Sequence, residues 1–155
     1  MIHREMDKTN SYLFHSGTCT AAYEFMGSHP ATVDGTAGYV FRVWAPNAKA
    51  VSVVGDFDQW DDTKAPMEKG EGGIWSCFIP GMDRYDNYKY AVTGPDGEQR
   101  MKADPYGFHF ETRPGNCSKI YDLGEYSWGD DKWRKFRREH PFSASPLNIY
   151  EVHLG

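Results

Sequence analysis

Between residues 39 and 123, apolar and polar positions alternate in short segments that are separated by turn-forming residues. Alternation with a period of two is the pattern of a β-strand with one buried face. The sequence Gly-Pro-Asp-Gly at residues 94–97 predicts a hairpin turn, because proline presets φ and glycine accepts a positive φ. Regularly spaced strands predict an all-β fold, an antiparallel β-sandwich. The expected strands are 39–44, 50–57, 74–79, 87–93, 98–102 and 117–123.

The same alternation nominates the residues that face the interior. In the segment 87–93, Tyr88 and Tyr90 share one face, whereas Asn87 and Lys89 share the opposite, outward face. Trp44 and Trp75 lie inside strand segments, so both are expected in the core. The alternating core positions are Tyr39, Phe41, Val43, Val51, Val53, Tyr88, Tyr90 and Val92.

The segments outside the sandwich divide the rest of the chain. A short helix is expected around residues 21–26, ended by Gly27 and Pro30. A second helix is expected over 128–141, because its first turn is acidic and its last turn is basic. The expected regions are an N-terminal arm over 1–36, the sandwich over 37–123, a helix and linker over 124–146, and an unpaired strand over 147–155.

Composition supports the β assignment and limits the classes of partner that the chain is expected to bind. Aromatic residues make up 15% of the chain and there are 16 glycines, which favours strands and turns over a helical bundle. A net charge of −5 argues against a nucleic acid or an anionic membrane as a general partner. Three cysteines without a C-x-x-C motif indicate reduced thiols and a cytoplasmic location. No apolar run reaches the ~18 residues of a membrane span.

No motif of a catalytic centre emerges from the residues. G-x-S-x-G, H-E-x-x-H and the P-loop are absent, and the six histidines share no ligand spacing. The stretch Asp-Phe-Asp-Gln-Trp-Asp-Asp at 56–62 starts like a calcium loop but lacks the central glycine and the last acidic ligand. We therefore expect no metal, no cofactor and no catalytic residue in this chain.

Trp60 is the residue whose surroundings point to binding. It lies in a polar loop that includes Asp56 and Asp58, with nowhere obvious to bury its ring locally. One interpretation is that the indole folds back onto the sheet. The other is that it forms a flat platform for the apolar face of a sugar ring, while Asn87 and Lys89 hydrogen-bond the sugar hydroxyls.

Several stretches resemble a known family. GYVFRVWAPNAKAVSVVGDFDQW (38–60), GIWSCFIPG (73–81) and YKYAV (88–92) resemble carbohydrate-binding module family 48, an immunoglobulin-like β-sandwich of α-glucan enzymes. The surrounding stretches are similar to bacterial 1,4-α-glucan (glycogen) branching enzymes of glycoside hydrolase family 13. These stretches are AYEFMGSHP (22–30), KADPYGFHFETRPG (102–115) and PLNIYEVHLG (146–155).

The resemblance implies a non-catalytic module that binds or positions α-glucan such as glycogen. The parent enzyme would transfer an α-1,4-linked segment to a 6-hydroxyl and so form an α-1,6 branch. Residues 147–155 would be the first strand of its (β/α)₈ catalytic barrel, the expected protein partner. The catalytic carboxylates would lie on later barrel strands, so no position here inherits their roles. The glycan-binding residues expected are Trp60, Asn87, Lys89 and Asn116.

One departure from the pattern keeps two alternatives open. Related kinase-type modules carry a second sugar-stacking tryptophan after the Asp-Gly turn, where this chain has Gln99 and Arg100. The module would then be a structural sandwich that packs on the barrel and binds little sugar. The remaining alternative is a module of a debranching hydrolase.

Overall fold

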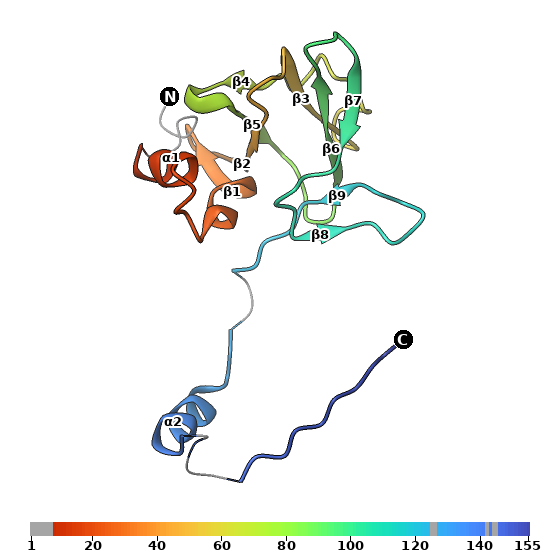
Figure 1. Cartoon of the computed structure of the whole chain (residues 1–155). Coiled ribbons are helices and arrows are strands. Elements are labelled where there is room, and N and C mark those ends of the chain that lie inside the picture. The colour runs from red at the N-terminus through yellow and green to blue at the C-terminus, as the bar shows by residue number, and fades with distance from the viewer. Residues whose placement is uncertain (1–7, 125–126, 142, 144–145) are drawn as a thin grey trace. The chain divides into compact units, whose positions relative to one another are not determined.

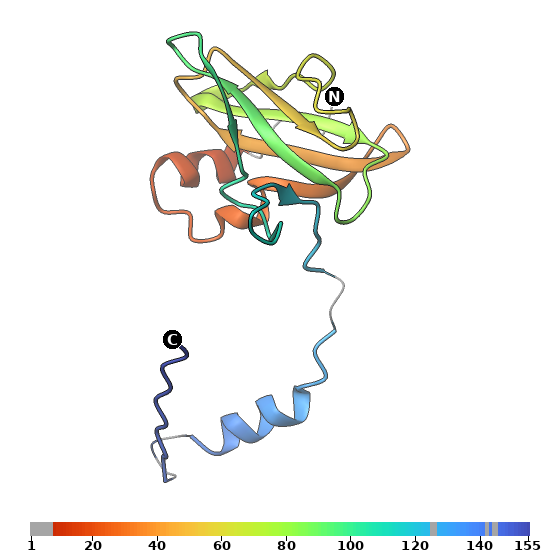
Figure 2. The same ribbon diagram turned by 90° about the vertical axis from the view of Figure 1, so that its right-hand side faces the viewer.

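The computed structural model describes residues 8–124, 127–141, 143 and 146–155 (Figure 1). A first compact unit ends at Leu123, and a second begins at Gly124. The first unit consists of two antiparallel β-sheets whose buried side chains form one shared core. Figure 2 shows the same strands from a viewpoint turned by 90°. The all-β sandwich expected from the alternating pattern is confirmed.

The first sheet has the strand order β1-β2-β5-β4. Asp34 and Gly35 have positive φ values of 49° and 79°, which forms the tight hairpin turn between β1 and β2. Phe41 on β2 lies opposite Cys77 on β5. The strands are β1 (Gly27–Val33), β2 (Thr36–Trp44), β4 (Glu68–Lys69) and β5 (Ile74–Pro80).

The second sheet has the order β3-β6-β9-β8, and β7 also pairs with β6. Gly55 on β3 lies opposite Tyr88 on β6, so the end of β3 and the start of β6 meet. Asn87 lies opposite Lys119 on the other side of β6. The strands are β3 (Ala50–Gly55), β6 (Asn87–Thr93), β7 (Gln99–Lys102), β8 (His109–Phe110) and β9 (Ser118–Lys119).

The core between the sheets follows the predicted alternation. Phe41, Val53, Tyr88 and Tyr90 have no exposed surface, and Tyr39 and Val92 are partly buried against them. Trp75 is also buried, as expected. The prediction for Trp44 was wrong, because its side chain is 52% exposed. Val43 takes the inward position beside it, while the Trp44 Nε1–H donates to the carbonyl of Gly72 at 3.1 Å.

A buried carboxylate ties the second sheet to the segment after β7. Asp104 is 1% exposed, and its Oδ2 accepts hydrogen bonds from the hydroxyls of Tyr88 at 2.7 Å and Tyr90 at 3.1 Å. Its Oδ1 accepts the Tyr106 N–H at 2.8 Å. Burial raises the pKa of this carboxyl, outweighing the opposing hydrogen bonds from the tyrosines.

The N-terminal elements differ from the expectation. The strand β1 and the helix α1 (Lys8–His15) were not predicted. Only a short 3₁₀ helix, η1 (Ala22–Glu24), forms where an α-helix was expected, and a second, η2 (Glu71–Gly73), precedes β5. Within the described residues, β1 pairs with β2 alone and is an edge strand, a position in which Pro30 is tolerated.

In the second unit, helix α2 (Asp131–Glu139) lies inside the expected range 128–141. Its aromatic side chains stack along one face, with ring centroids 5.7 Å apart for Trp133 and Phe136. The strand expected at the end of the chain is not formed: the described residues 146–155 have no regular secondary structure. Ile149 is 85% exposed. Within the described residues, no helix has the length and apolar character needed to cross a membrane.

Candidate functional site

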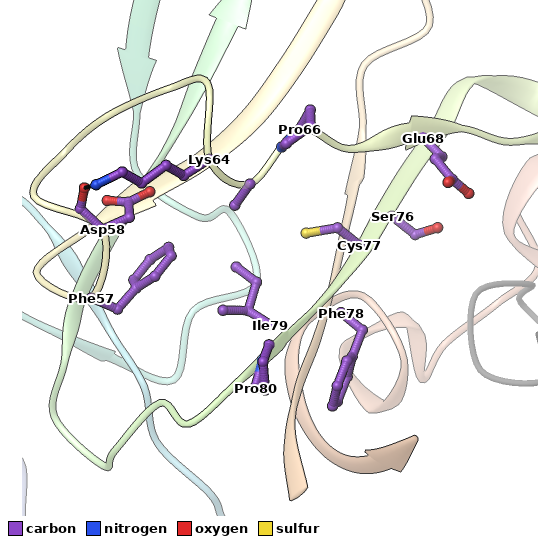
Figure 3. A pocket seen from close by; sticks show the side chains of 11 residues that line it. Phe57, Asp58, Lys64, Pro66, Glu68, Ser76, Cys77, Phe78, Ile79 and Pro80 are labelled. Atoms are coloured by element: carbon purple, nitrogen blue, oxygen red, sulfur yellow. Dashed lines mark hydrogen bonds between the residues drawn. The ribbon is translucent and has the colours of Figure 1, made fainter. Parts of the chain in front are cut away.

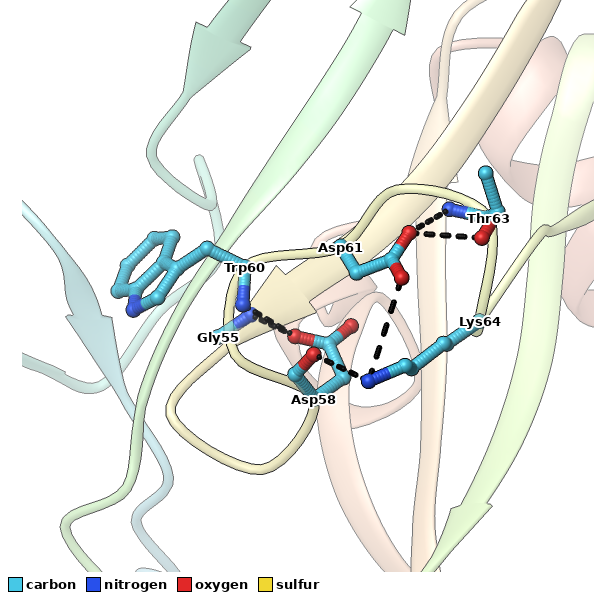
Figure 4. Close-up of polar contacts among 6 residues, drawn as sticks. All are labelled: Gly55, Asp58, Trp60, Asp61, Thr63 and Lys64. Carbon is cyan, nitrogen blue, oxygen red and sulfur yellow. Dashed lines mark hydrogen bonds and ion pairs between the residues drawn. The ribbon is translucent and has the colours of Figure 1, made fainter.

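The loop that follows β3 holds Trp60 in a left-handed backbone conformation, with φ of 64°, next to Gln59 with φ of 62°. Such values are unfavourable for side chains with a Cβ, so the surrounding contacts must maintain them. Asp58 Oδ1 accepts the N–H groups of Gly55 at 3.0 Å and of Trp60 at 2.9 Å (Figure 4). The Trp60 N–H is also 3.0 Å from the Gly55 carbonyl oxygen. The loop is thus closed on itself by a buried carboxylate.

The Trp60 ring is anchored at one edge and open elsewhere. Its Nε1–H donates to Asp56 Oδ1 at 3.2 Å, and 38% of the residue remains exposed. Figure 4 shows the indole pointing out of the loop, away from Thr63 and Lys64. The indole is therefore positioned by the protein and still presents apolar surface to solvent.

Asp56 connects Trp60 to the start of β6. Its Oδ2 accepts the backbone N–H of Asn87 at 3.2 Å and the side-chain Nδ2–H at 2.9 Å. The Asn87 Oδ1 is buried and has no hydrogen-bond partner within the described chain. Asp56 was not among the predicted site residues. The antiparallel pairing of β3 with β6 could have identified Asp56, because it places the residue after β3 beside the first residue of β6.

Lys89 and Asn116 also meet, because the Lys89 ammonium donates to Asn116 Oδ1. The loop around Asn116 is fixed by Glu111, whose Oε2 accepts the N–H of Asn116 at 3.0 Å and of Cys117 at 2.9 Å. These hydrogen bonds, that from Cys117 above all, lower the pKa of Glu111. The carboxylate therefore stays ionised and keeps the loop in place.

The structure brings the four predicted site residues into two linked pairs. Trp60 and Asn87 share Asp56, and Lys89 binds Asn116. Asn87 and Lys89 are two residues apart on β6, so both side chains lie on the outer face of the second sheet. The arrangement offers one flat aromatic ring beside amide and ammonium groups.

The residues after the Asp-Gly turn are engaged within the protein. Gln99 donates through Nε2 to Asp62 Oδ2, which joins β7 to the Trp60 loop. Arg100 forms ion pairs with Asp96 at 2.8 Å and with Glu98 at 2.7 Å. No aromatic ring occupies this position, as the sequence indicated.

Two pockets lined by described residues of the first unit lie away from these side chains. One, of about 320 Å³, lies between β5 and the Trp60 loop and is lined by Phe57, Asp58, Lys64, Ala65, Pro66, Glu68 and residues 76–80 (Figure 3). A second, of about 770 Å³, lies beside α1 and includes Tyr12, His15 and Arg42. Neither contains the predicted site residues. Among the described residues, no three His, Cys, Asp or Glu side chains gather as metal ligands would.

Comparison with known proteins matches this architecture. Residues 25–107 fit the family model of carbohydrate-binding module 48, the isoamylase N-terminal domain. The 1,4-alpha-glucan branching enzyme GlgB of Thermosynechococcus vestitus is 46% identical over 144 residues, which cover 93% of this chain and 19% of that protein. GlgB of Bacillus subtilis is 44% identical over 145 residues, covering 93% of this chain and 23% of that protein. The chain spans about a fifth of the length of these curated relatives.

Among solved structures, pullulanase from Bacillus acidopullulyticus superposes with a TM-score of 0.51 at 27% identity, covering 63% of this chain and 12% of that protein. The family match at residues 25–107 extends over more than half of the 155 residues and includes Trp60, Asn87 and Lys89. The resemblance seen in the sequence is thereby confirmed. The chain belongs to the carbohydrate-binding module 48 family.

Proposed function

We propose that this chain is the α-glucan-binding and positioning module of a glycogen branching enzyme. The parent enzyme would carry the transfer reaction on a catalytic barrel that begins with the segment 147–155. This module would hold a glucan chain near that barrel and take no part in bond breaking. Family membership and the two branching enzymes at 46% and 44% identity support this assignment.

The observation that carries the proposal is the anchored Trp60 ring beside polar groups. A sugar ring presents C–H bonds on its face and hydroxyls around its edge, so it needs an apolar plane next to donors and acceptors. The Trp60 indole provides that plane, and Asn87, Lys89 and Asn116 provide the polar groups. Because Asp56 fixes the indole edge, little conformational freedom would be lost on binding.

A second candidate is a structural module that packs on the barrel and binds little sugar. The observation in its favour is that Gln99 and Arg100 are tied to acidic neighbours where a second stacking ring would be needed. The debranching alternative has less support. The pullulanase is 27% identical to this chain, far below the branching enzymes.

Titration calorimetry with a linear maltooligosaccharide separates these candidates. The unaltered chain should bind, and Trp60→Ala should weaken binding about tenfold, because the stacking plane is lost. Trp44→Ala is the matched control, since Trp44 is an exposed tryptophan on the other sheet and its loss should leave affinity unchanged. Equal binding by the unaltered chain and Trp60→Ala, or no binding by either, would favour the structural role.

A further inference from the structure

Tyr85 shares with Trp60 an uncommon backbone feature. Among the described residues other than glycine, positive φ values occur at Asp34, Gln59, Trp60 and Tyr85. Asp34 belongs to a tight hairpin turn, which accounts for its conformation. Tyr85, with φ of 76°, is the third residue of a β-turn in which the Asp86 N–H donates to the Asp83 carbonyl oxygen at 3.2 Å, a position that favours glycine over a bulky aromatic residue. Backbone strain of this kind gathers at ligand-binding positions, where it presents a side chain in a defined direction.

Trp60 and Tyr85 lie at the same end of the second sheet. Trp60 follows β3, Tyr85 precedes β6, and these two strands are antiparallel neighbours. The loops are joined where the Asp56 N–H donates to the Asn87 carbonyl oxygen at 3.1 Å. The Tyr85 N–H donates to the Ile120 carbonyl oxygen at 2.9 Å, which fixes the loop before β6. Both aromatic residues are therefore held by backbone contacts to the sheet end.

The Tyr85 ring belongs to an aromatic cluster that remains open to solvent. Its centroid lies 5.4 Å from His109 and 5.9 Å from Tyr121. The Arg84 guanidinium lies 5.1 Å from the Tyr85 ring and 4.4 Å from the Tyr121 ring. Tyr85 is nevertheless 49% exposed. Exposed aromatic surface beside a hydrogen-bonding cation has the composition of a carbohydrate-binding surface.

The pairing of strands makes this cluster continuous with the Trp60 site. The strand β9 pairs with β6 and with β8, as the labels in Figure 1 allow the reader to follow. Asn87 on β6 lies opposite Lys119 on β9, and Lys119 lies opposite His109 on β8. Residues directly opposite one another in a sheet share a face, so these three side chains lie on one face. The outer face therefore runs from Trp60 through Asn87 to His109 and Tyr85.

We propose that Tyr85 is a second sugar-binding platform, supported by Arg84 and Tyr121, and that one α-glucan chain spans from Trp60 across Asn87 to Tyr85. This inference rests on the proposed function, because it extends the same surface. The second aromatic contact would then come from the loop before β6. Tyr85 would lie on the opposite side of Asn87 from Gln99, the position at which kinase-type modules carry their second tryptophan. A glucan long enough to reach both rings would bind more tightly than a short one.

The test compares maltotriose with maltoheptaose by titration calorimetry on the 155-residue chain. Tyr85→Gly removes the ring, and glycine accepts a φ of 76° without strain, so the backbone can keep its course. Maltoheptaose affinity should fall about three- to tenfold, while maltotriose affinity should stay within about twofold. Tyr23→Ala is the matched control, because Tyr23 is also 49% exposed but lies in η1, so both affinities should stay those of the unaltered chain. Thermal unfolding checks that each variant is folded.

The outcomes separate this inference from the proposed function. Unchanged maltoheptaose affinity in Tyr85→Gly, alongside weakened binding in Trp60→Ala, would overturn the Tyr85 platform and leave the Trp60 site intact. Equal weakening of both sugars by Tyr85→Gly would also overturn it, because it would show no dependence on chain length. If Trp60→Ala binds both sugars like the unaltered chain, the proposed function fails and the extension fails with it.

Discussion

Removing the Asp104 carboxylate should destabilise the sandwich, because this buried group accepts hydrogen bonds from two tyrosines and from the backbone. In Asp104→Ala, the hydroxyl of Tyr90 and the N–H of Tyr106 lose their acceptor, while the Tyr88 hydroxyl retains Ser28 Oγ at 3.2 Å. An unsatisfied buried donor costs about 1–3 kcal/mol, which applies to the Tyr90 hydroxyl, whereas the Tyr106 N–H is only partly buried and can regain water, so the total is about 1–4 kcal/mol. A typical domain has only about 5–15 kcal/mol of stability, so the variant should be markedly less stable.

Urea unfolding followed by tryptophan fluorescence measures this loss. The midpoint should move to a much lower urea concentration, while the slope of the unfolding free energy against urea concentration stays constant. That combination indicates a change of stability alone. Asp96→Ala is the matched control, because Asp96 is an exposed aspartate paired with Arg100 and should leave the midpoint nearly unchanged. A midpoint for Asp104→Ala close to that of the unaltered chain would refute the assigned role of this carboxylate.

The same carboxylate predicts a pH dependence. Burial raises the pKa of Asp104 above its ordinary value of 3.8, so between pH 3.8 and the raised pKa the folded state holds a proton that the unfolded state has released. The stability that the Asp104 carboxyl adds to the folded state is therefore complete below pH 3.8, and it is lost as pH rises through the raised pKa of the folded state. Relative to Asp104→Asn, which cannot titrate there, the unaltered chain should lose stability as pH rises across this window. A relative gain with rising pH would contradict the assignment.

Three further substitutions test the Trp60 site, the start of β1 and the segment 146–155. Asp56→Ala should weaken maltooligosaccharide binding about threefold, because both Trp60 and Asn87 lose a fixed partner; unchanged affinity would exclude a positioning role. Gly27→Ala should destabilise the fold by about 1–3 kcal/mol, because φ is 89° and the new Cβ would lie 3.1 Å from the Tyr106 Cβ; an unshifted urea midpoint would argue against this strain. Ile149→Asp should change stability by less than about 0.5 kcal/mol, because the side chain is exposed, and a larger loss would show that the tail packs on the protein.

The central strands were predictable from sequence because each has one face in the core. The alternation in β2 and β6 follows burial, and the side chains of Phe41 and Tyr88 lie where it places them. In β3 and β5, consecutive residues are buried, so their apolar runs and not an alternation marked them as strands. The strand β1 was missed because it is an edge strand with proline and little apolar alternation. The helix α1 was missed because none of its side chains is buried, so no apolar stripe marks it.

The candidate site was only partly predictable for a related reason. Trp60 was identified because a large apolar ring in a polar loop is conspicuous in the sequence. The roles of Asp56 and Asp58 depend on hydrogen bonds that form only when the loop closes. The left-handed conformation of Tyr85 and its ring contacts with His109 and Tyr121 depend on strand pairing, which residue types alone do not encode.

A nuclear magnetic resonance titration of the isotope-labelled chain with maltoheptaose tests the central claim most directly. The indole N–H of Trp60 bonds Asp56, and the side-chain amides of Asn87 and Asn116 bond Asp56 and Lys89, so each reports on the proposed surface. These three signals should shift together and saturate at the same sugar concentration, while the indole signal of Trp44 stays constant. Shifts confined to Trp44 and its neighbours, or no shift at saturating sugar, would contradict a glucan-binding surface at Trp60.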